Sequence, residues 1–215
     1  MTHTSAALSL TLGARLSREI EVDLSVPWRD LETDDRELRG IGDITATAVW
    51  SPFPEFNISF LGGLRLPTGD KDLGVFAGST GEVVPLGNGA WEALLGASYH
   101  VQLLDRVRMF TSLVATIPLN DADAVPPAPT VLGSASVNTV QWRVAAAVTV
   151  AEPVDLYAAL DVQWKDKEAG VKGDVGETIE WGTLGAVVEL PGRLTLEVSW
   201  RIAHELVTVG VTRRF

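Results

Sequence analysis

The side chains that could carry covalent or metal chemistry are few and scattered. The sequence contains no cysteine and three histidines, His3, His100 and His204. A disulfide scaffold and a Cys-based zinc site are therefore excluded, and the histidines are too few for a His-rich metal site. A lone histidine beside loop acids is more often a surface residue than a general base. We predict that the protein is not an enzyme and has no catalytic residue, no metal and no cofactor.

Acidic and basic side chains form a second candidate set, and their chemistry is electrostatic. The chain holds 28 acids and 17 bases, and its net charge is −11. This balance argues against nucleic acid as a partner, because a backbone binder needs a basic face. It also argues against electrostatic docking on anionic lipid. Acids and arginines are interleaved along the chain, so side chains of both signs are expected to pair across neighbouring strands.

The charges lie in segments in which apolar and polar residues alternate, which is typical of β-strands with two different faces. In one segment Ile20, Val22 and Leu24 share a face, while Glu21 and Asp23 share the other. Most segments exceed the roughly 5–6 residues of an average strand and reach the about 9–11 that cross a bilayer. Eleven segments are counted, at residues 5–16, 19–28, 41–51, 56–66, 90–102, 106–117, 138–151, 155–165, 177–190, 193–202 and 204–215.

Short turns and long polar loops alternate between these segments. The long loops are 29–40, 67–89, 118–137 and 166–176. This is the pattern of an up-and-down meander closed into a barrel, and outer-membrane barrels have short periplasmic turns and longer outer loops. The sequence therefore predicts an all-β protein, an up-and-down antiparallel transmembrane β-barrel that forms a single domain over residues 1–215.

Charge falls on one face of the predicted barrel wall. Odd-numbered and even-numbered positions of a strand lie on opposite faces, and we call the face that a position takes its parity. The segments 177–190 and 204–215 have ambiguous or mixed parity and are set aside. In the other segments no position on the apolar face is charged. In a membrane barrel the apolar face meets lipid and the charged face encloses a wet lumen. The charged side chains would hold the barrel round through salt bridges, set solute selectivity, or both. The predicted pore-lining residues are Arg15, Glu21, Asp23, Asp43, Arg65, Glu92, Arg106, Arg108, Arg143, Asp161, Glu197 and Arg201.

The seven tryptophans decide which medium the apolar face meets. All seven take the apolar parity, and all but Trp50 lie toward the long-loop end of their strands. Two belts of amphipathic rings fit the headgroup levels of a bilayer, whereas core tryptophans of a soluble barrel have no reason to gather at one end. The predicted membrane-interface belt is Trp28, Trp50, Trp91, Trp142, Trp164, Trp181, Trp200 and Phe215.

Two alternatives compete with an outer-membrane channel. A soluble ligand-binding barrel would turn the apolar face inward around an apolar cavity, and the net charge of −11 and the lack of a visible leader favour it. The tryptophan belts, the strand lengths and the loop asymmetry oppose it. An outer-membrane hydrolase would place an active site at the rim around His204, with Asp34, Asp35 and Asp70 as the acids that could approach it.

Short glycine-rich motifs follow one another in order. They are Gly40-Ile-Gly-Asp43 at the start of a strand, Leu64-Arg-Leu-Pro-Thr-Gly-Asp70 at the end of its hairpin partner, and Pro85-Leu-Gly-Asn-Gly-Ala-Trp91. With the earlier stretch from Leu12 to Trp28, they make most of the chain resemble the outer-membrane transporters associated with the meta-pathway of phenol degradation. The resemblance implies a barrel in the outer membrane of Gram-negative bacteria that admits small, often apolar or aromatic, compounds. It brings no catalytic residues.

The number of strands is expected to differ from the number counted. Eleven strands put the first residue at the outer end and Phe215 at the periplasmic end, whereas bacterial single-chain barrels have an even number. The resemblance also implies a leader and a further strand before the first segment, so about 12 strands are expected. We predict either a missing signal peptide and first strand or an irregular closure between the first and last strands.

A barrel of 11 or 12 strands encloses at most a narrow pore. The loop Thr68–Asn88 is a candidate gate that folds inward. The expected partners are the lipid bilayer, a small-molecule solute and the barrel-assembly machinery, which would read Phe215.

Overall fold

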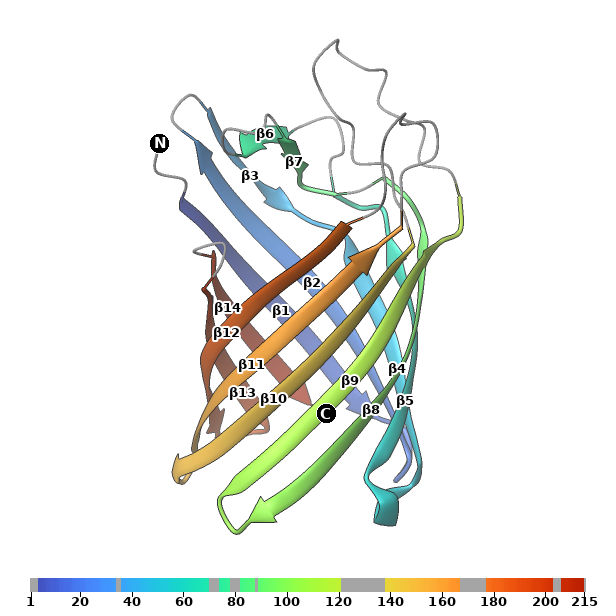
Figure 1. Ribbon diagram of the computed structural model, residues 1–215, viewed down its shortest axis with the longest axis vertical. Helices are drawn as coiled ribbons and strands as arrows, with labels where there is room; N and C mark the ends of the chain where they lie inside the picture. The colour runs from blue at the N-terminus through green and yellow to red at the C-terminus, as the bar shows by residue number, and fades with distance from the viewer. Residues whose placement is uncertain are drawn as a thin grey trace.

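Long, tilted strands wrap around a common axis in the computed structural model, which is a closed β-barrel (Figure 1). The structure describes residues 4–33, 36–69, 74–77, 82–87, 89–120, 138–166, 177–202 and 206–214. Within these residues, no helix is long and apolar enough to cross a membrane. The strands are β1 (Thr4–Arg15), β2 (Ile20–Thr33), β3 (Arg36–Ile41), β4 (Ile44–Phe53), β5 (Ile58–Leu66), β6 (Gly74–Ala77), β7 (Glu82–Pro85), β8 (Glu92–Leu104), β9 (Val107–Pro118), β10 (Thr139–Ala151), β11 (Val154–Lys165), β12 (Glu177–Leu190), β13 (Leu194–Arg201) and β14 (Leu206–Arg214).

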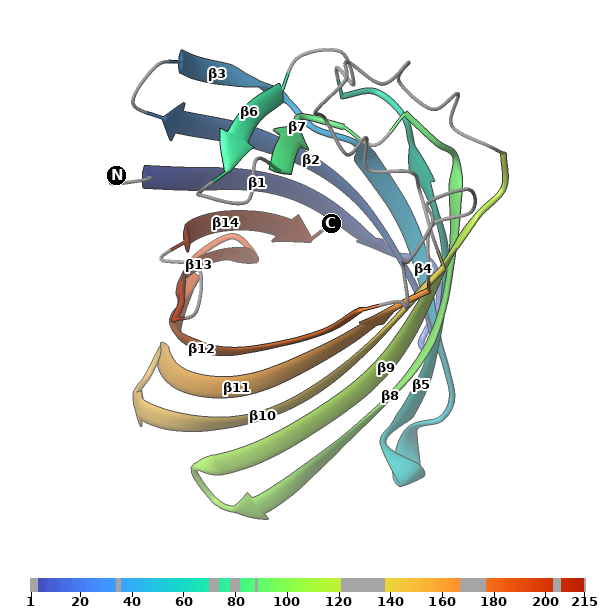
Figure 2. The ribbon, with the colours of Figure 1, turned by 45° about the horizontal axis from the view of Figure 1, so that its top comes forward.

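The wall of the barrel is antiparallel except at one seam. β1 pairs with β14 in parallel, from Ser5 opposite Leu206 to Gly13 opposite Arg214, and Figure 2 shows the two strands side by side. A ring of hairpins with an odd number of strands must contain one parallel pair, because its first and last strands then run the same way. Eleven described strands close the wall, and β3 is the twelfth strand of the sheet. The closure between the first and last strands is thus the irregular one.

The hairpin of β2 and β3 corrects one prediction. Residues 29–40 were expected to form a polar loop, but Trp28 pairs with Ile41 and the ladder continues to Thr33 and Arg36. The alternation fails here because the outer side of the hairpin is charged above Trp28, where Arg39 contacts Asp30 at 3.0 Å. Charge on this side indicates that the hairpin extends beyond the hydrocarbon, so that neither face needs to be apolar.

Tight turns connect the strands at one end of the barrel. Between β1 and β2, the backbone N–H groups of Glu19 and Ile20 donate to Ser17 Oγ at 3.2 and 3.1 Å. Between β12 and β13, Gly192 and Arg193 take φ values of 83° and 59°, a region that glycine enters without steric cost. The β6–β7 hairpin is at the opposite end, against β2 and β3 (Figure 1). This asymmetry matches the predicted alternation of turns and loops.

The two faces of the wall differ in polarity. Leu160 and Asp161 are neighbours on β11, yet Leu160 is 51% exposed on the outer surface and Asp161 is fully buried inside. Each strand that closes the wall carries at least one large exposed apolar side chain. Buried apolar residues are few in the described chain: Leu86, Ala90, Leu94, Val162 and Trp181. The barrel therefore has no hydrophobic core of the kind that a soluble barrel needs.

Candidate solute pathway through the barrel

Ion pairs between neighbouring strands line the interior. Arg65 on β5 stands directly opposite Glu92 on β8, and Arg65 Nη1 contacts Glu92 Oε2 at 2.6 Å. Arg15 stands opposite Glu21 in the same way, at 3.6 Å. Opposite positions on antiparallel strands share a face, so the register itself brings the two signs together. Salt bridges therefore form between predicted pore-lining residues on three pairs of strands, since Arg143 and Asp161 do the same on β10 and β11.

Asp161 is the most buried charge of the described interior and has the most partners. Arg143 donates to it through Nε at 2.8 Å and Nη2 at 3.3 Å. Gln141 Nε2 donates to Oδ1 at 3.0 Å, and Thr183 Oγ1 lies 3.4 Å from Oδ2. Both carboxylate oxygens are thus satisfied, which a fully buried anion requires. We call Gln141, Arg143, Asp161 and Thr183 the ionic cluster; it joins β10, β11 and β12.

Three more contacts extend this polar network toward the short-turn end. Tyr157 donates from its hydroxyl to Glu197 Oε1 at 2.5 Å, which links β11 to β13. Arg108 pairs with Asp155, which also accepts a hydrogen bond from Thr149 at 2.6 Å. Tyr157 and Asp155 were not among the predicted pore-lining residues, although both have the polar parity of β11. Alternation places both on the polar face of the segment, so the sequence held a signal for them that the list of pore-lining residues did not use.

A cluster without charge faces the interior on β1 and β2. The hydroxyl oxygens of Ser9 and Ser25 are 2.9 Å apart, and Thr11 Oγ1 donates to Ser25 Oγ at 3.2 Å. We call Ser9, Thr11 and Ser25 the hydroxyl cluster. Small hydroxyl side chains leave space in the lumen and bond equally well to water or to one another. The hydroxyl cluster itself is wettable without being ionised, although Arg15, Glu21 and Asp23 bring charge to the same face of β1 and β2.

The glycine-rich motifs converge at the outer mouth. Gly42 and Asp43 lie between β3 and β4, where the chain has one residue more than the part of β2 that faces it. This extra residue makes a β-bulge, which directs Asp43 inward. Gly69 N–H donates to Asp43 Oδ1 at 3.0 Å, and Thr68 Oγ1 donates to Gly42 O at 3.0 Å. The bulge therefore holds the end of the β5 hairpin, and it does so through two motifs that are separated in the sequence.

The third motif packs into the same place. A Cβ added at Gly87 would overlap Asp43 Oδ1 and the backbone of Gly69, and one added at Gly40 would lie 2.5 Å from Leu86 Cδ1. Leu86 is 3% exposed. The segment that precedes β8 thus folds inward at Leu86 and Gly87, and the gating role of this segment stays a prediction. Asn88 and most of the residues between Thr68 and Leu86 lie outside the described residues or have undescribed side chains.

The remaining predicted pore residues are less uniform. Asp23 takes the inner parity on β2, and Asp43 is buried at the bulge. Arg106 lies in the turn between β8 and β9, not on a strand of the wall. Arg29, which was assigned to a loop, occupies the inner face of β2 opposite Gly40, close enough to Asp43 for their charges to interact. Sequence reasoning missed Arg29 because the loop assignment removed its parity.

The tryptophans were predicted to share the outer face, and one of them does not. Trp28, Trp50, Trp91, Trp142, Trp164 and Trp200 are each 40–49% exposed on the outer surface. Trp181 is 6% exposed and lies inside, directly opposite Asp161 on β11. Its place in the predicted belt was wrong because the parity of β12 was ambiguous: glycines and threonines occur on both of its faces. Phe215, like His204, lies outside the described residues.

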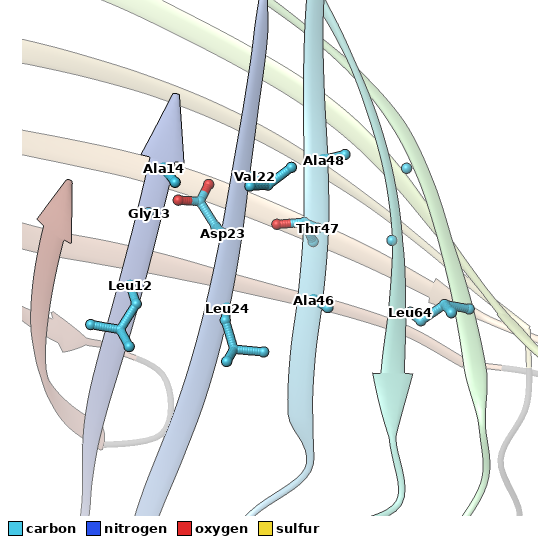
Figure 3. Close-up of a pocket in the computed structure, with 12 residues that line it drawn as sticks. Leu12, Gly13, Ala14, Val22, Asp23, Leu24, Ala46, Thr47, Ala48 and Leu64 are labelled. Carbon is cyan, nitrogen blue, oxygen red and sulfur yellow. The ribbon is translucent and has the colours of Figure 1, made fainter. Parts of the chain in front are cut away.

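A hollow of about 490 Å³ occurs on the apolar surface of β1, β2, β4 and β5. Figure 3 shows Leu12, Leu24 and Leu64 around smaller side chains such as Ala14 and Ala48. The three leucines are 41–43% exposed, so the hollow belongs to the outer face and not to the lumen. Among the described residues no group of His, Cys, Asp or Glu side chains is arranged to hold a metal ion.

The fold and the interior together define a transmembrane β-barrel, with an apolar outer surface and an ionised lumen. The family described as "Putative MetA-pathway of phenol degradation" matches residues 5–209, and the chain belongs to this family. Among solved structures, the barrel is similar to an outer membrane channel from Pseudomonas putida F1. The two share 17% sequence identity with a TM-score of 0.56, over 87% of this chain and 71% of the other. No curated protein matches the sequence.

Proposed function

We propose that the protein is an outer-membrane channel through which small solutes, apolar and aromatic compounds among them, pass passively along a narrow, charge-lined lumen. The observation that carries the proposal is the inside-out distribution of side chains, for which Leu160 and Asp161 are the clearest example. Hydrocarbon stabilises a continuous apolar outer surface, and an ionised interior needs water. The likeness to an outer membrane channel supports the same role.

The lumen is narrow because of its strand number and its outer mouth. Eight-stranded barrels fill their interiors with side chains and sixteen-stranded porins hold a wide channel, so an eleven-stranded barrel lies between them. Leu86 and Gly87 reduce the opening further where they pack on Gly40 and Asp43. We propose that this inward fold limits the size of the solute and that its release from Asp43 opens the mouth.

The location and the assembly route are part of the same proposal. An apolar band with exposed tryptophans fits the outer membrane of a Gram-negative cell, where single-chain barrels of this kind reside. Phe215 would then present a terminal aromatic to the barrel-assembly machinery. Deleting Phe215 is expected to lower the amount of folded barrel in the outer membrane severalfold, which fractionation and gel mobility without heating can measure. An unchanged yield would remove Phe215 from the proposal.

A soluble barrel with an apolar cavity is the alternative that the structure opposes most directly. It would need its apolar residues inside, where the described strands place Arg143, Asp161 and Tyr157. The two proposals differ in one simple observation, since only the membrane barrel needs detergent to stay folded and monodisperse. The rim hydrolase depends on His204, which lies outside the described residues.

Reconstitution in planar bilayers tests the channel proposal. The wild-type protein is expected to produce stepwise conductance, and Ser112→Trp is expected to reduce it because Ser112 takes the lumen parity of β9 opposite Arg143. Leu113→Trp is the matched control: the next residue on the same strand is 50% exposed on the outer surface, so the added ring would lie in lipid. Failure of the folded wild-type protein to conduct would overturn the proposal, and so would an equal effect of the two variants.

A further inference from the structure

We infer that the lumen contains a binding site for small organic carboxylates, formed by Arg201 on β13 and Trp181 on β12. This inference rests on the proposed channel function and names a class of solute for it. It depends on how these two side chains are placed beside the ionic cluster.

Arg201 stacks on an aromatic ring, and its charge is also close enough to Asp161 for the two to attract, without a salt bridge between them. Its guanidinium carbon lies 4.5 Å from the centroid of the Trp181 ring, in cation–π contact. Trp181 is 6% exposed, so the ring is a fixed platform, and stacking on it orients the planar guanidinium without using its N–H groups. Arg201 itself is partly exposed. Its donors therefore remain available to a ligand in the lumen.

The nearest acid is already occupied. Asp161 accepts two hydrogen bonds from Arg143 and one each from Gln141 and Thr183, so neither of its oxygens is left for Arg201. No salt bridge joins Arg201 to a carboxylate anywhere in the described chain. Asp161 and Arg143 neutralise each other, which leaves Arg201 as one additional positive charge at this level of the lumen.

The other acid on β13 is too distant to take this role. Glu197 shares the inner face of β13 with Arg201 but lies four residues earlier, about 13 Å along an extended strand. It also accepts a hydrogen bond from Tyr157 at 2.5 Å. A separation of that size in a water-filled lumen exceeds the Debye length of about 10 Å at 0.1 M salt. A solute near Arg201 therefore meets a positive charge.

The geometry of a free guanidinium selects the class of ligand. Its N–H groups form a planar fork that matches the two oxygens of a carboxylate. Thr183, directly opposite Arg201 on β12, is buried and donates its hydroxyl hydrogen to Asp161, so the guanidinium supplies the donors at this level. Since the channel is proposed to pass apolar and aromatic compounds, the ligand is a carboxylate on a small organic body, and benzoate is a suitable probe.

The test uses single-channel recordings in potassium chloride with benzoate added. Benzoate is expected to reduce the wild-type current, and Arg201→Gln to raise the half-blocking concentration about tenfold, the effect of losing one charge-assisted hydrogen bond. Arg201→Lys keeps the charge without the fork and is expected to fall between the two. Trp181→Leu changes no charge, yet it should raise the half-blocking concentration about threefold by releasing the guanidinium.

Controls distinguish binding at this site from a general attraction of anions to the arginines of the lumen. Arg108→Gln removes another arginine of the barrel, one that is paired with Asp155, and is expected to leave the half-blocking concentration within about twofold, since an already neutralised arginine offers little to an anion. Benzamide, a neutral probe of similar size, should block no more in wild type than in Arg201→Gln. Equal block of wild type and Arg201→Gln by benzoate would overturn the inference, and so would benzamide block of the wild-type channel at the same half-blocking concentration as benzoate. Normal wild-type conductance with either result would leave the channel proposal standing.

Discussion

The ionic cluster on β10–β12 and the hydroxyl cluster on β1 and β2 occupy the same lumen and meet its polarity in different ways. Asp161 is fully buried and depends on Arg143, Gln141 and Thr183, so the loss of one partner leaves a charge without compensation. Ser9 and Ser25 donate and accept interchangeably, and water can replace either. A lumen cluster built around a buried charge therefore depends on each of its partners, whereas a cluster built from hydroxyl groups does not.

Removing the acid of the ionic cluster is the strongest way to break this comparison. Asp161→Leu is expected to destabilise the folded barrel by about 3–5 kcal/mol, because Arg143 is left without its counter-ion. Unfolding by urea in detergent, followed by gel mobility without heating, measures the change. The double variant Arg143→Met with Asp161→Leu removes both charges and should recover most of the loss. A double variant as unstable as the single one would show that the unpaired charge of Arg143 is not what destabilises the Asp161→Leu barrel.

The outer face of the same strand gives the next largest effect. Leu160→Arg places a charge where the side chain is 51% exposed to the proposed hydrocarbon, and a cost of about 2–4 kcal/mol is expected near the bilayer midplane. Leu160→Ala is the matched control, with a much smaller cost. Membrane insertion of purified protein into liposomes provides the measurement. Equal insertion of Leu160→Arg and wild type would contradict the assignment of this face.

Changes at the outer mouth are expected to have an intermediate effect, because the acid there, Asp43, accepts a hydrogen bond from an uncharged backbone N–H group. Asp43→Ala removes the acceptor of the Gly69 N–H group and is expected to cost about 1–2 kcal/mol of local stability. Release of Leu86 and Gly87 should then raise the frequency of large conductance states. Single-channel records of the two proteins test this, with Asp23→Ala as a control for the loss of a lumen acid elsewhere. Identical gating in wild type and Asp43→Ala would mean that the inward fold is not a gate.

The hydroxyl cluster is expected to show the smallest effect. Ser25→Ala removes one partner of Ser9 and Thr11, but both hydroxyls can turn to water, so the free energy of unfolding should change by less than about 1 kcal/mol. The same urea titration measures it. A loss as large as that of Asp161→Leu would erase the difference between the two clusters.

Much of this comparison could be predicted from the sequence, because a single-layered wall makes side-chain direction depend only on parity. That rule placed Asp161 inside and Leu160 outside before any pairing was known. It failed at Trp181, where glycine and threonine on both faces of β12 leave no apolar side to count from. It also failed at Arg29, because a hairpin that extends beyond the bilayer has no lipid-facing pattern.

The partners of each charge were beyond the sequence for a different reason. Which residue of β11 faces Arg143 depends on the register between strands, and turn length and barrel closure set that register. The parallel seam between β1 and β14 is likewise a property of the closed ring and not of either strand. The convergence of Asp43, Gly69 and Gly87 also joins segments whose order along the chain says nothing about their distance.

The absence of native cysteine makes one measurement especially direct. Single cysteines at Leu160→Cys and Ala159→Cys, labelled with a small fluorophore, place neighbouring probes on the two faces of β11 in reconstituted membranes. If Leu160 faces hydrocarbon and Ala159 faces the lumen, brominated lipid quenches the probe at residue 160 and aqueous iodide quenches the probe at residue 159. Iodide quenching at 160 with lipid quenching at 159 would contradict this placement of the two faces, and so would aqueous quenching of both.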